Sequence, residues 1–263
     1  MNARALYIVV AVVAGIGAPL HGGAEEPAAA KAAEADAKKA REAEIKAALE
    51  AFKKAFKGAE LERADAVRKL ADVHDRKILA QLAAVLGDPG ANVRIEAAAA
   101  LGAYAKDHDA AQAVATALAA TKKQPQVQTA YLDALGKIRD YGQAQGVIDQ
   151  FDDLDLDVAR AALRASGDIR APAFVPKLID FLDDAGGGGA ATKAASFAEW
   201  RVRRAELQIA AGLALVKITD QRFRDVKTWK DWWKTNSARV TAALQKEDRD
   251  ERERIEKEAK AGK

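Results

Sequence analysis

The amino-acid sequence predicts an all-α protein made of stacked helical hairpins, an α-solenoid. Apolar residues make up 49% of its 263 residues but aromatic residues only 6%, so alanine, the strongest helix former, carries much of the apolar total. After residue 20 we find no run of β-branched residues alternating with polar ones, the pattern typical of strands. A ten-residue pattern recurs along the chain, which indicates a repeat protein.

The recurring pattern starts with valine and reaches glycine nine positions later. Copies begin at Val93, Val127 and Val158, which are 34 and 31 residues apart. A degenerate fourth copy begins at Leu207, where Val216 takes the place of the glycine. We expect each copy to form the second helix of a hairpin, and residues 60–75 to form the second helix of an irregular first unit.

Each copy follows a shorter amphipathic segment and a turn, marked by residues such as Gly87, Pro89 and Pro125. The glycine that ends the pattern is suited to a left-handed residue after the helix. A single hairpin cannot bury its own apolar face, so neighbouring units are expected to stack. Small residues three or four positions into each copy would let the two helices of a unit approach closely: Ala97, Ala130, Ala161 and Ala210.

One stretch carries a family resemblance, in Leu86-Gly87-Asp88, Val93-Arg94, Ala97 and Leu101-Gly102. This arrangement resembles the HEAT repeat, and its period resembles the shorter HEAT-like units first noted in phycobilisome lyases. The resemblance covers residues 60–220 and extends to exported bacterial HEAT-repeat proteins, which also end in a tryptophan-rich segment. It implies a right-handed superhelix whose second helices line a concave binding face.

The N-terminus is predicted to be a cleavable signal peptide, residues 1–24. Arg4 precedes an uncharged stretch over residues 5–20, and small residues occupy positions 22–24. The alternative is an uncleaved membrane anchor, but a helix needs about 20 apolar residues to span a bilayer, and this stretch is shorter. We therefore expect an exported chain, periplasmic or extracellular, whose mature form begins near Glu25 and has no integral membrane span.

Further segments flank or interrupt the predicted solenoid, which extends over residues 58–236. Residues 25–57 comprise an Ala/Lys/Glu-rich linker and an amphipathic helix with an apolar stripe at Ile45, Leu49, Phe52 and Phe56. Residues 184–198 are expected to form a flexible, glycine-rich insertion. Residues 237–263 are predicted to be a charged C-terminal helix, a solvated and partly disordered tail.

Residues 224–236 contain three tryptophans on one face of a predicted helix. Trp229, Trp232 and Trp233 share this face because they are spaced three and four residues apart. Tryptophan is common in binding hot spots and sugar-binding platforms. A bulky cap over the last repeat explains the same pattern, since a solenoid otherwise exposes the apolar side of its final hairpin. We favour the cap.

The sequence contains no recognisable catalytic or metal-binding motif. Asp153, Asp155 and Asp157 match the opening of a calcium loop, but Val158 replaces its glycine and Arg164 its glutamate. We interpret these aspartates as residues at a helix N-terminus. Cysteine is absent, and the three histidines, His21, His74 and His108, lack metal-ligand spacing. We therefore predict a non-enzyme with no catalytic, cofactor-binding or metal-binding residues.

Charge and resemblance together limit the expected function. The formal net charge of +3 is spread over interleaved acidic and basic residues, which disfavours nucleic-acid binding because that needs clustered cations. The resemblance implies a protein-binding scaffold outside the cytoplasm, and its partner, binding residues and oligomeric state stay open. One alternative is a bilin-lyase-like or chaperone-like protein; the export signal weighs against the lyase, because bilin attachment takes place inside the cell. Another is a protein associated with the cell wall or membrane.

Overall fold

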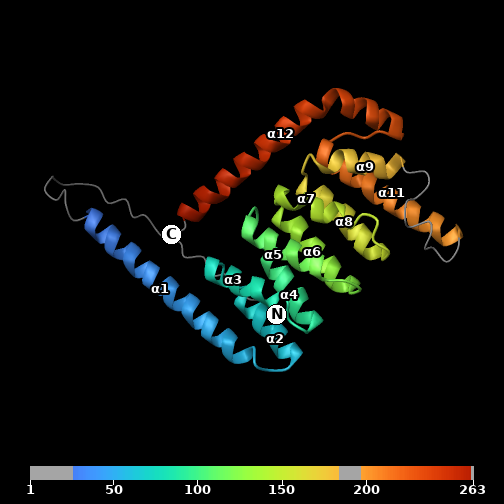
Figure 1. The fold of residues 1–263 in the computed structure, drawn as a ribbon. Coiled ribbons are helices and arrows are strands. Elements are labelled where there is room, and N and C mark those ends of the chain that lie inside the picture. The colour runs from blue at the N-terminus through green and yellow to red at the C-terminus, as the bar shows by residue number, and fades with distance from the viewer. Residues whose placement is uncertain (1–25, 184–196, 262–263) are drawn as a thin grey trace, which may run out of the picture. The chain divides into compact units, whose positions relative to one another are not determined.

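The computed structural model describes residues 26–183 and 197–261, and this part of the chain contains helices and no strand. The all-α prediction is therefore confirmed for these residues. The chain divides into two compact units, residues 1–40 and 41–263, and every contact below lies within the second. The predicted signal peptide and most of the glycine-rich insertion lie outside the described residues. The helices (Figure 1) are α1 Glu26–Ala55, α2 Glu60–Leu70, α3 Arg76–Val85, α4 Ala91–Leu101, α5 His108–Ala120, α6 Pro125–Ile138, the 3-10 helix η1 Tyr141–Gln143, α7 Ala144–Ile148, α8 Leu156–Ile169, α9 Phe174–Asp183, α11 Phe197–Thr219 and α12 Val226–Ala261.

The Ala/Lys/Glu-rich stretch, expected to be a loose linker or a frayed helix, is helical, because α1 runs unbroken from Glu26 to Ala55. The apolar stripe of the amphipathic segment packs inward: Ile45 and Phe52 are buried, and Leu49 and Phe56 contact the same core. Within the described residues, no helix combines the length and hydropathy needed to cross a membrane.

Aspartates begin several helices, and left-handed residues end two of them. Asp75, Asp107 and Asp155 accept hydrogen bonds from backbone N–H groups in the first turns of α3, α5 and α8. The residues that follow α6 and α8 are Arg139 and Arg170, both with a φ of 60°. The prediction that glycine would occupy this left-handed position is therefore wrong.

The repeated glycine serves close helix packing instead. Gly136 lies inside α6, and a Cβ added to it would come within 3.3 Å of Cα of Ala165 in α8. Gly167 lies inside α8, and its added Cβ would come within 3.1 Å of Cα of Ala214 in α11. Both distances are shorter than an ordinary van der Waals contact, so a larger residue would displace the neighbouring backbone. The glycine thus allows successive second helices to pack closely.

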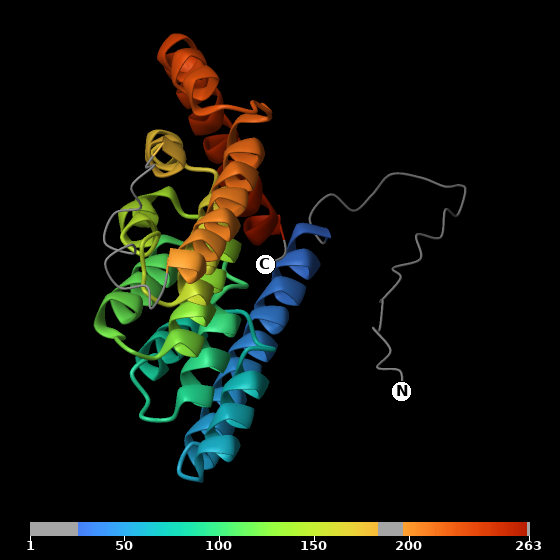
Figure 2. The same cartoon turned by 90° about the vertical axis from the view of Figure 1, so that its right-hand side faces the viewer.

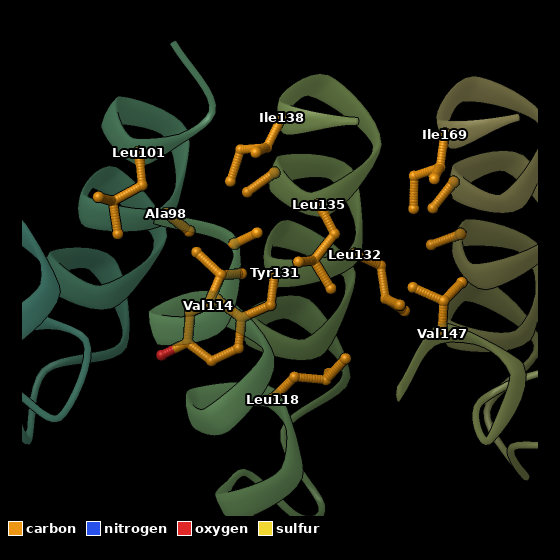
Figure 3. Close-up of a cluster of buried hydrophobic side chains, with 14 of the residues drawn as sticks. Ala98, Leu101, Val114, Leu118, Tyr131, Leu132, Leu135, Ile138, Val147 and Ile169 are labelled. Atoms are coloured by element: carbon orange, nitrogen blue, oxygen red, sulfur yellow. The ribbon is translucent and has the colours of Figure 1, made fainter. Parts of the chain in front are cut away.

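The second helices form a row in chain order. α2 packs against α4, α4 against α6, α6 against α8 and α8 against α11, while α3, α5, α7 and α9 each pack against the row helix that follows them (Figure 1). Apolar side chains fill the space between the helices, as Figure 3 shows for Val114 and Leu118 of α5 and Tyr131 of α6. The buried hydroxyl of Tyr131 donates to the carbonyl oxygen of Leu86, 2.8 Å away. Neighbouring hairpins therefore share one core.

The charged C-terminal segment is an ordered helix, so the expectation of partial disorder is wrong, whereas most of its side chains are exposed, as expected. α12 runs from Val226 to Ala261 with no break between the tryptophans and the charged residues. Part of it packs against α9, and Leu244 is buried further along. The apolar stripe is sparse here because this helix docks mainly through charged side chains.

Candidate binding surfaces

The aspartates that resemble a calcium loop cap a helix, as interpreted from the sequence. The carboxylate of Asp155 accepts hydrogen bonds from the N–H groups of Asp157 and Val158, which open α8. The carboxylate of Asp153 accepts one from the N–H group of Asp155 at 2.8 Å. In the part of the chain that the structure describes, no three acidic or histidine side chains are grouped so as to hold a metal ion.

The histidines make local contacts at helix ends. His74 precedes α3 and stacks on Tyr104, with ring centroids 3.9 Å apart. His108 begins α5, and its Nδ1 lies 3.5 Å from Oδ1 of Asp140. His21 lies outside the described residues. Each of the two described imidazoles therefore makes a local contact near a helix end.

The tryptophans form an aromatic cluster in the first turns of α12. Trp229 is only 3% exposed and lies edge-on to Phe223, with ring centroids 4.8 Å apart. Trp232 meets both rings, while Trp233 packs beside Trp232 and stays partly accessible. This burial favours a packing role for Trp229, as the cap interpretation predicts. Val202, Ile209 and Leu213 of the last row helix, α11, nevertheless remain exposed.

A row of cations marks the ends of successive units. Lys106, Arg139 and Arg170 follow α4, α6 and α8, and all three adopt left-handed backbone conformations with φ of 59° or 60°. They are 33 and 31 residues apart, close to the spacing of the repeated pattern. Because the helices before them stand side by side, the three side chains line one edge of the row. We call these residues the basic row.

The basic row binds an acidic face of α12. Three carboxylates of this helix, at positions i, i+1 and i+4, share the face. Arg170 pairs at the start of this stretch, and Lys106 and Arg139 pair further along it, so α12 runs back along the row that precedes it (Figure 1). The ion pairs are Arg170–Glu247 at 2.8 Å, Arg139–Glu251 at 2.7 Å, Lys106–Asp248 at 2.7 Å and Lys106–Glu251 at 3.3 Å.

The contact at Lys106 is enclosed. The side chain of Lys106 is 5% exposed and that of Asp248 12%. Burial disfavours the charged carboxylate of Asp248, but hydrogen bonds from Lys106 and Arg252 outweigh burial, so the pKa of this carboxyl group is lowered. Arg252 also reaches Asp140 at 3.1 Å and donates to the carbonyl oxygen of Lys106 at 2.9 Å. This part of the interface is a compensated buried network, in which loss of one charge is costly.

A tyrosine closes the same contact. The hydroxyl of Tyr141 donates to the carbonyl oxygen of Leu244 at 3.3 Å, and Nζ of Lys106 lies 5.0 Å from the centre of its ring. Burial raises the pKa of Tyr141 to about 12, and nearby carboxylates add to the effect. The phenol therefore stays neutral and keeps its donor proton over a wide pH range.

Sequence reasoning missed the basic row, although one signal was present. Lysine or arginine stands 12 or 13 positions after the start of the first three copies, at Lys106, Arg139 and Arg170, whereas the fourth has Asp220. In the sequence alone, a cation that recurs at a turn looks like any solvent-exposed lysine or arginine. Its role as a binding residue is visible only from its contacts with residues 247–251.

A second surface lies on α11, at the end of the row of second helices. Val202, Ile209 and Leu213 are 60%, 65% and 61% exposed, and Ala205 and Val216 lie on the same side of the helix. We call these five residues the α11 face. In Figure 2 this end of the row faces the viewer, with α11 in orange.

Repeat alignment explains why this face is open. The contacts Gly136–Ala165 and Gly167–Ala214 align α8 with α11 at an offset of 49 residues. At that offset Ile209 corresponds to Arg160, whose guanidinium contacts Glu206 of α11 at 3.2 Å. Val216 corresponds to Gly167, which also packs on α11. Ile209 and Val216, at the centre and one end of the α11 face, thus lie on the side that would receive a further second helix.

A third, shallower feature is a groove of about 620 Å³ between α3 and α5. Ala83, Ala113 and Ala117 form much of its wall, and Arg94 and Asp109 are its charged side chains. Arg94 also contacts Gln124. The groove is open rather than enclosed, so it would bury only part of a small ligand, whereas ligand pockets bury most of the ligand surface.

No protein-family model matches the chain, and no curated protein sequence matches it.

Proposed function

We propose that this chain is a non-catalytic, protein-binding scaffold of HEAT-like repeats that acts outside the cytoplasm. One observation carries the proposal: turn residues of three successive units, Lys106, Arg139 and Arg170, together hold an acidic helix. The row of stacked second helices supports the α-solenoid, and the predicted signal peptide over residues 1–24 supports export.

The basic row is suited to a helical partner with an acidic face. Its cations are fixed by left-handed turns on a packed row, so they are held near the contact positions before a helix arrives. Carboxylates at i, i+1 and i+4 meet them from a single helix face, as Glu247, Asp248 and Glu251 do. We propose that a partner protein presents a similar acidic helix and that α12 competes with it for the basic row.

A peptide experiment tests this competition in the full chain. The release variant carries Asp248→Lys and Glu251→Lys, which set like charges against Lys106 and Arg139 while leaving the basic row intact. A fluorescent peptide of residues 238–261 should bind this variant at least about tenfold more tightly than it binds the unmodified chain. In the unmodified chain the tethered α12 competes at an effective concentration in the millimolar range. Fluorescence anisotropy measures the affinity.

A matched control changes the same number of charges elsewhere on α12. Glu253 and Glu256 are exposed and pair only with nearby lysines of their own helix. The variant Glu253→Lys with Glu256→Lys should bind the peptide as weakly as the unmodified chain. Peptide binding to the release variant should also weaken with added salt, because exposed charge interactions are screened. Equal, weak binding by both variants would contradict the proposal.

Export has a separate test. Expression in an exporting host, followed by N-terminal sequencing, should give a mature chain that begins near Glu25. An intact Met1 in the membrane fraction would contradict cleavage.

A further inference from the structure

We propose that the α11 face binds the α11 face of a second copy of this chain in an antiparallel, two-fold symmetric contact. Among the described residues, the exposed large apolar side chains are Leu61, Leu154, Val202, Ile209 and Leu213, and three of these five lie on the α11 face. Concentrated apolar exposure on one helix is typical of an interaction surface, whereas scattered single residues need no explanation.

A head-to-tail arrangement of copies is disfavoured because the other end of the row is covered. α2 begins the row, and the part of α1 after residue 40 packs there. Ile45 and Phe52 are buried, and the guanidinium of Arg63 in α2 lies 5.9 Å from the ring centre of Phe56. Among the described residues, the α2 end therefore presents Leu61 but no group of exposed apolar side chains that would match the α11 face. Two α11 faces can still cover each other, which closes the assembly at two copies.

The order of residues along α11 fits an antiparallel pair centred on Ile209. Val202 and Val216 lie seven residues on either side of Ile209, and Ala205 and Leu213 lie four residues on either side. An antiparallel contact therefore sets Val202 against Val216 of the second copy and Ala205 against its Leu213. An added Cβ at Gly212, beside this face, would meet nothing within 4 Å, so the backbone is open to a neighbouring helix.

Charge selects the antiparallel direction over the parallel one. Arg201, in the N-terminal half of α11, is exposed beside the α11 face, and a parallel contact would bring it near Arg201 of the second copy. The antiparallel contact brings this half toward the end of α11 followed by Asp220, whose side chain is 84% exposed. Like charges brought together oppose association, so the antiparallel contact is the more stable.

The α11 face is small, which sets the expected strength of the contact. The stretch from Val202 to Val216 spans about 21 Å of helix at about 1.5 Å per residue. Stable interfaces bury about 800 Å² per partner, more than a single helix face supplies. The contact should therefore be reversible, with a dissociation constant that is micromolar or weaker.

Sedimentation of the full chain over a range of concentrations measures this association. The unmodified chain should shift toward a dimer as concentration rises, and Ile209→Glu should remain a monomer. Leu61→Glu is the matched control: Leu61 is 74% exposed on α2, so this variant should dimerise normally. A monomer at every concentration for the unmodified chain, or dimers of Ile209→Glu, would overturn the proposal.

Single cysteines determine the geometry, because the chain contains none of its own. Ile209→Cys should form a disulfide-linked dimer under mild oxidation. Val202→Cys and Val216→Cys should cross-link with each other when mixed and much less when alone. Cross-linking of Val202→Cys with itself would overturn the antiparallel arrangement.

The proposed dimer contact and the proposed binding of an acidic helix by the basic row can be refuted separately. If a segment of the same chain covers the α11 face, Ile209→Cys will be slow to react with thiol reagents even in the monomer, and the dimer proposal fails. The release variant would still bind the acidic peptide in that case. Conversely, loss of peptide binding would leave dimerisation through α11 unchanged.

Discussion

Replacing Gly167 with alanine tests the packing of the row of second helices. An added Cβ at this position would lie 3.1 Å from both Cα of Ala214 and Cδ of Lys217, and 3.4 Å from Cβ of Ala214. The lysine side chain can move aside, but the backbone of Ala214 belongs to α11. Helices α8 and α11 would have to separate by a few tenths of an ångström to admit the methyl group.

The expected magnitude follows from two opposing effects. Alanine favours the helix interior over glycine by up to about 1 kcal/mol. Overpacking a filled contact typically costs about 1–3 kcal/mol. At Gly212, where an added Cβ meets nothing within 4 Å, only the first effect acts. Gly212→Ala should therefore stabilise the chain, and Gly167→Ala should leave it about 1–3 kcal/mol less stable than Gly212→Ala.

Urea unfolding followed by circular dichroism measures the difference. Repeat proteins can unfold in stages, so the comparison uses variants whose transitions keep the slope of the unmodified chain. Gly136→Ala provides an independent second site, because its added Cβ would lie 3.3 Å from Cα of Ala165. Equal stabilisation by Gly167→Ala and Gly212→Ala would refute the assignment of the repeated glycine to close packing.

Three further predictions concern α12 and its contacts. Trp229→Ala should destabilise the C-terminal hairpin by about 3–5 kcal/mol, whereas Trp233→Ala should cost less because Trp233 is only partly buried; thermal melts of both variants compare them. Because the pKa of Asp248 is lowered in the folded chain, this carboxylate contributes stability above its unfolded pKa of about 4, and that contribution is lost as pH falls through its folded pKa. Asp248→Asn should therefore lose less stability than the unmodified chain when pH falls through this range, as measured by urea midpoints. The pKa of Tyr141 is raised to about 12 from an ordinary value of about 10, so its contribution to the free energy of unfolding is fully present below pH of about 10 and is lost as pH rises further. Tyr141→Phe should therefore reduce the loss of stability at alkaline pH, and an unchanged pH profile would contradict this.

Local sequence pattern was sufficient to predict the all-α fold and the helix N-terminus at Asp155. Periodicity and helix-start chemistry act over a few residues, so they can be read without knowing what lies nearby. Gly136 and Gly167 were misassigned for the same reason. A glycine near a helix end suits a left-handed turn and a close helix contact equally well, and only the position of Ala165 or Ala214 distinguishes them.

The binding surfaces depend on contacts between distant residues. Lys106 and Asp248 are 142 residues apart, and neither lies in an apolar stripe that would predict burial. The α11 face was hidden within the fourth copy of the pattern, where apolar residues lie on both sides of the helix. Leu207 and Leu215 face the core, while Ile209 and Leu213 face away from it. Only the packing of α8 and α9 against α11 separates the two sets.

Hydrogen exchange along α12 in the full chain most directly tests whether the basic row binds an acidic helix. Amides of residues 244–252 should exchange slowly, because Lys106, Arg139 and Arg170 hold this stretch. Lys106→Glu should speed their exchange toward that of residues 256–261, whereas the matched change Lys137→Glu, on an exposed side chain, should not. If residues 244–252 exchange as rapidly in the unmodified chain as in Lys106→Glu, α12 does not dock on the basic row in solution, and the account is contradicted.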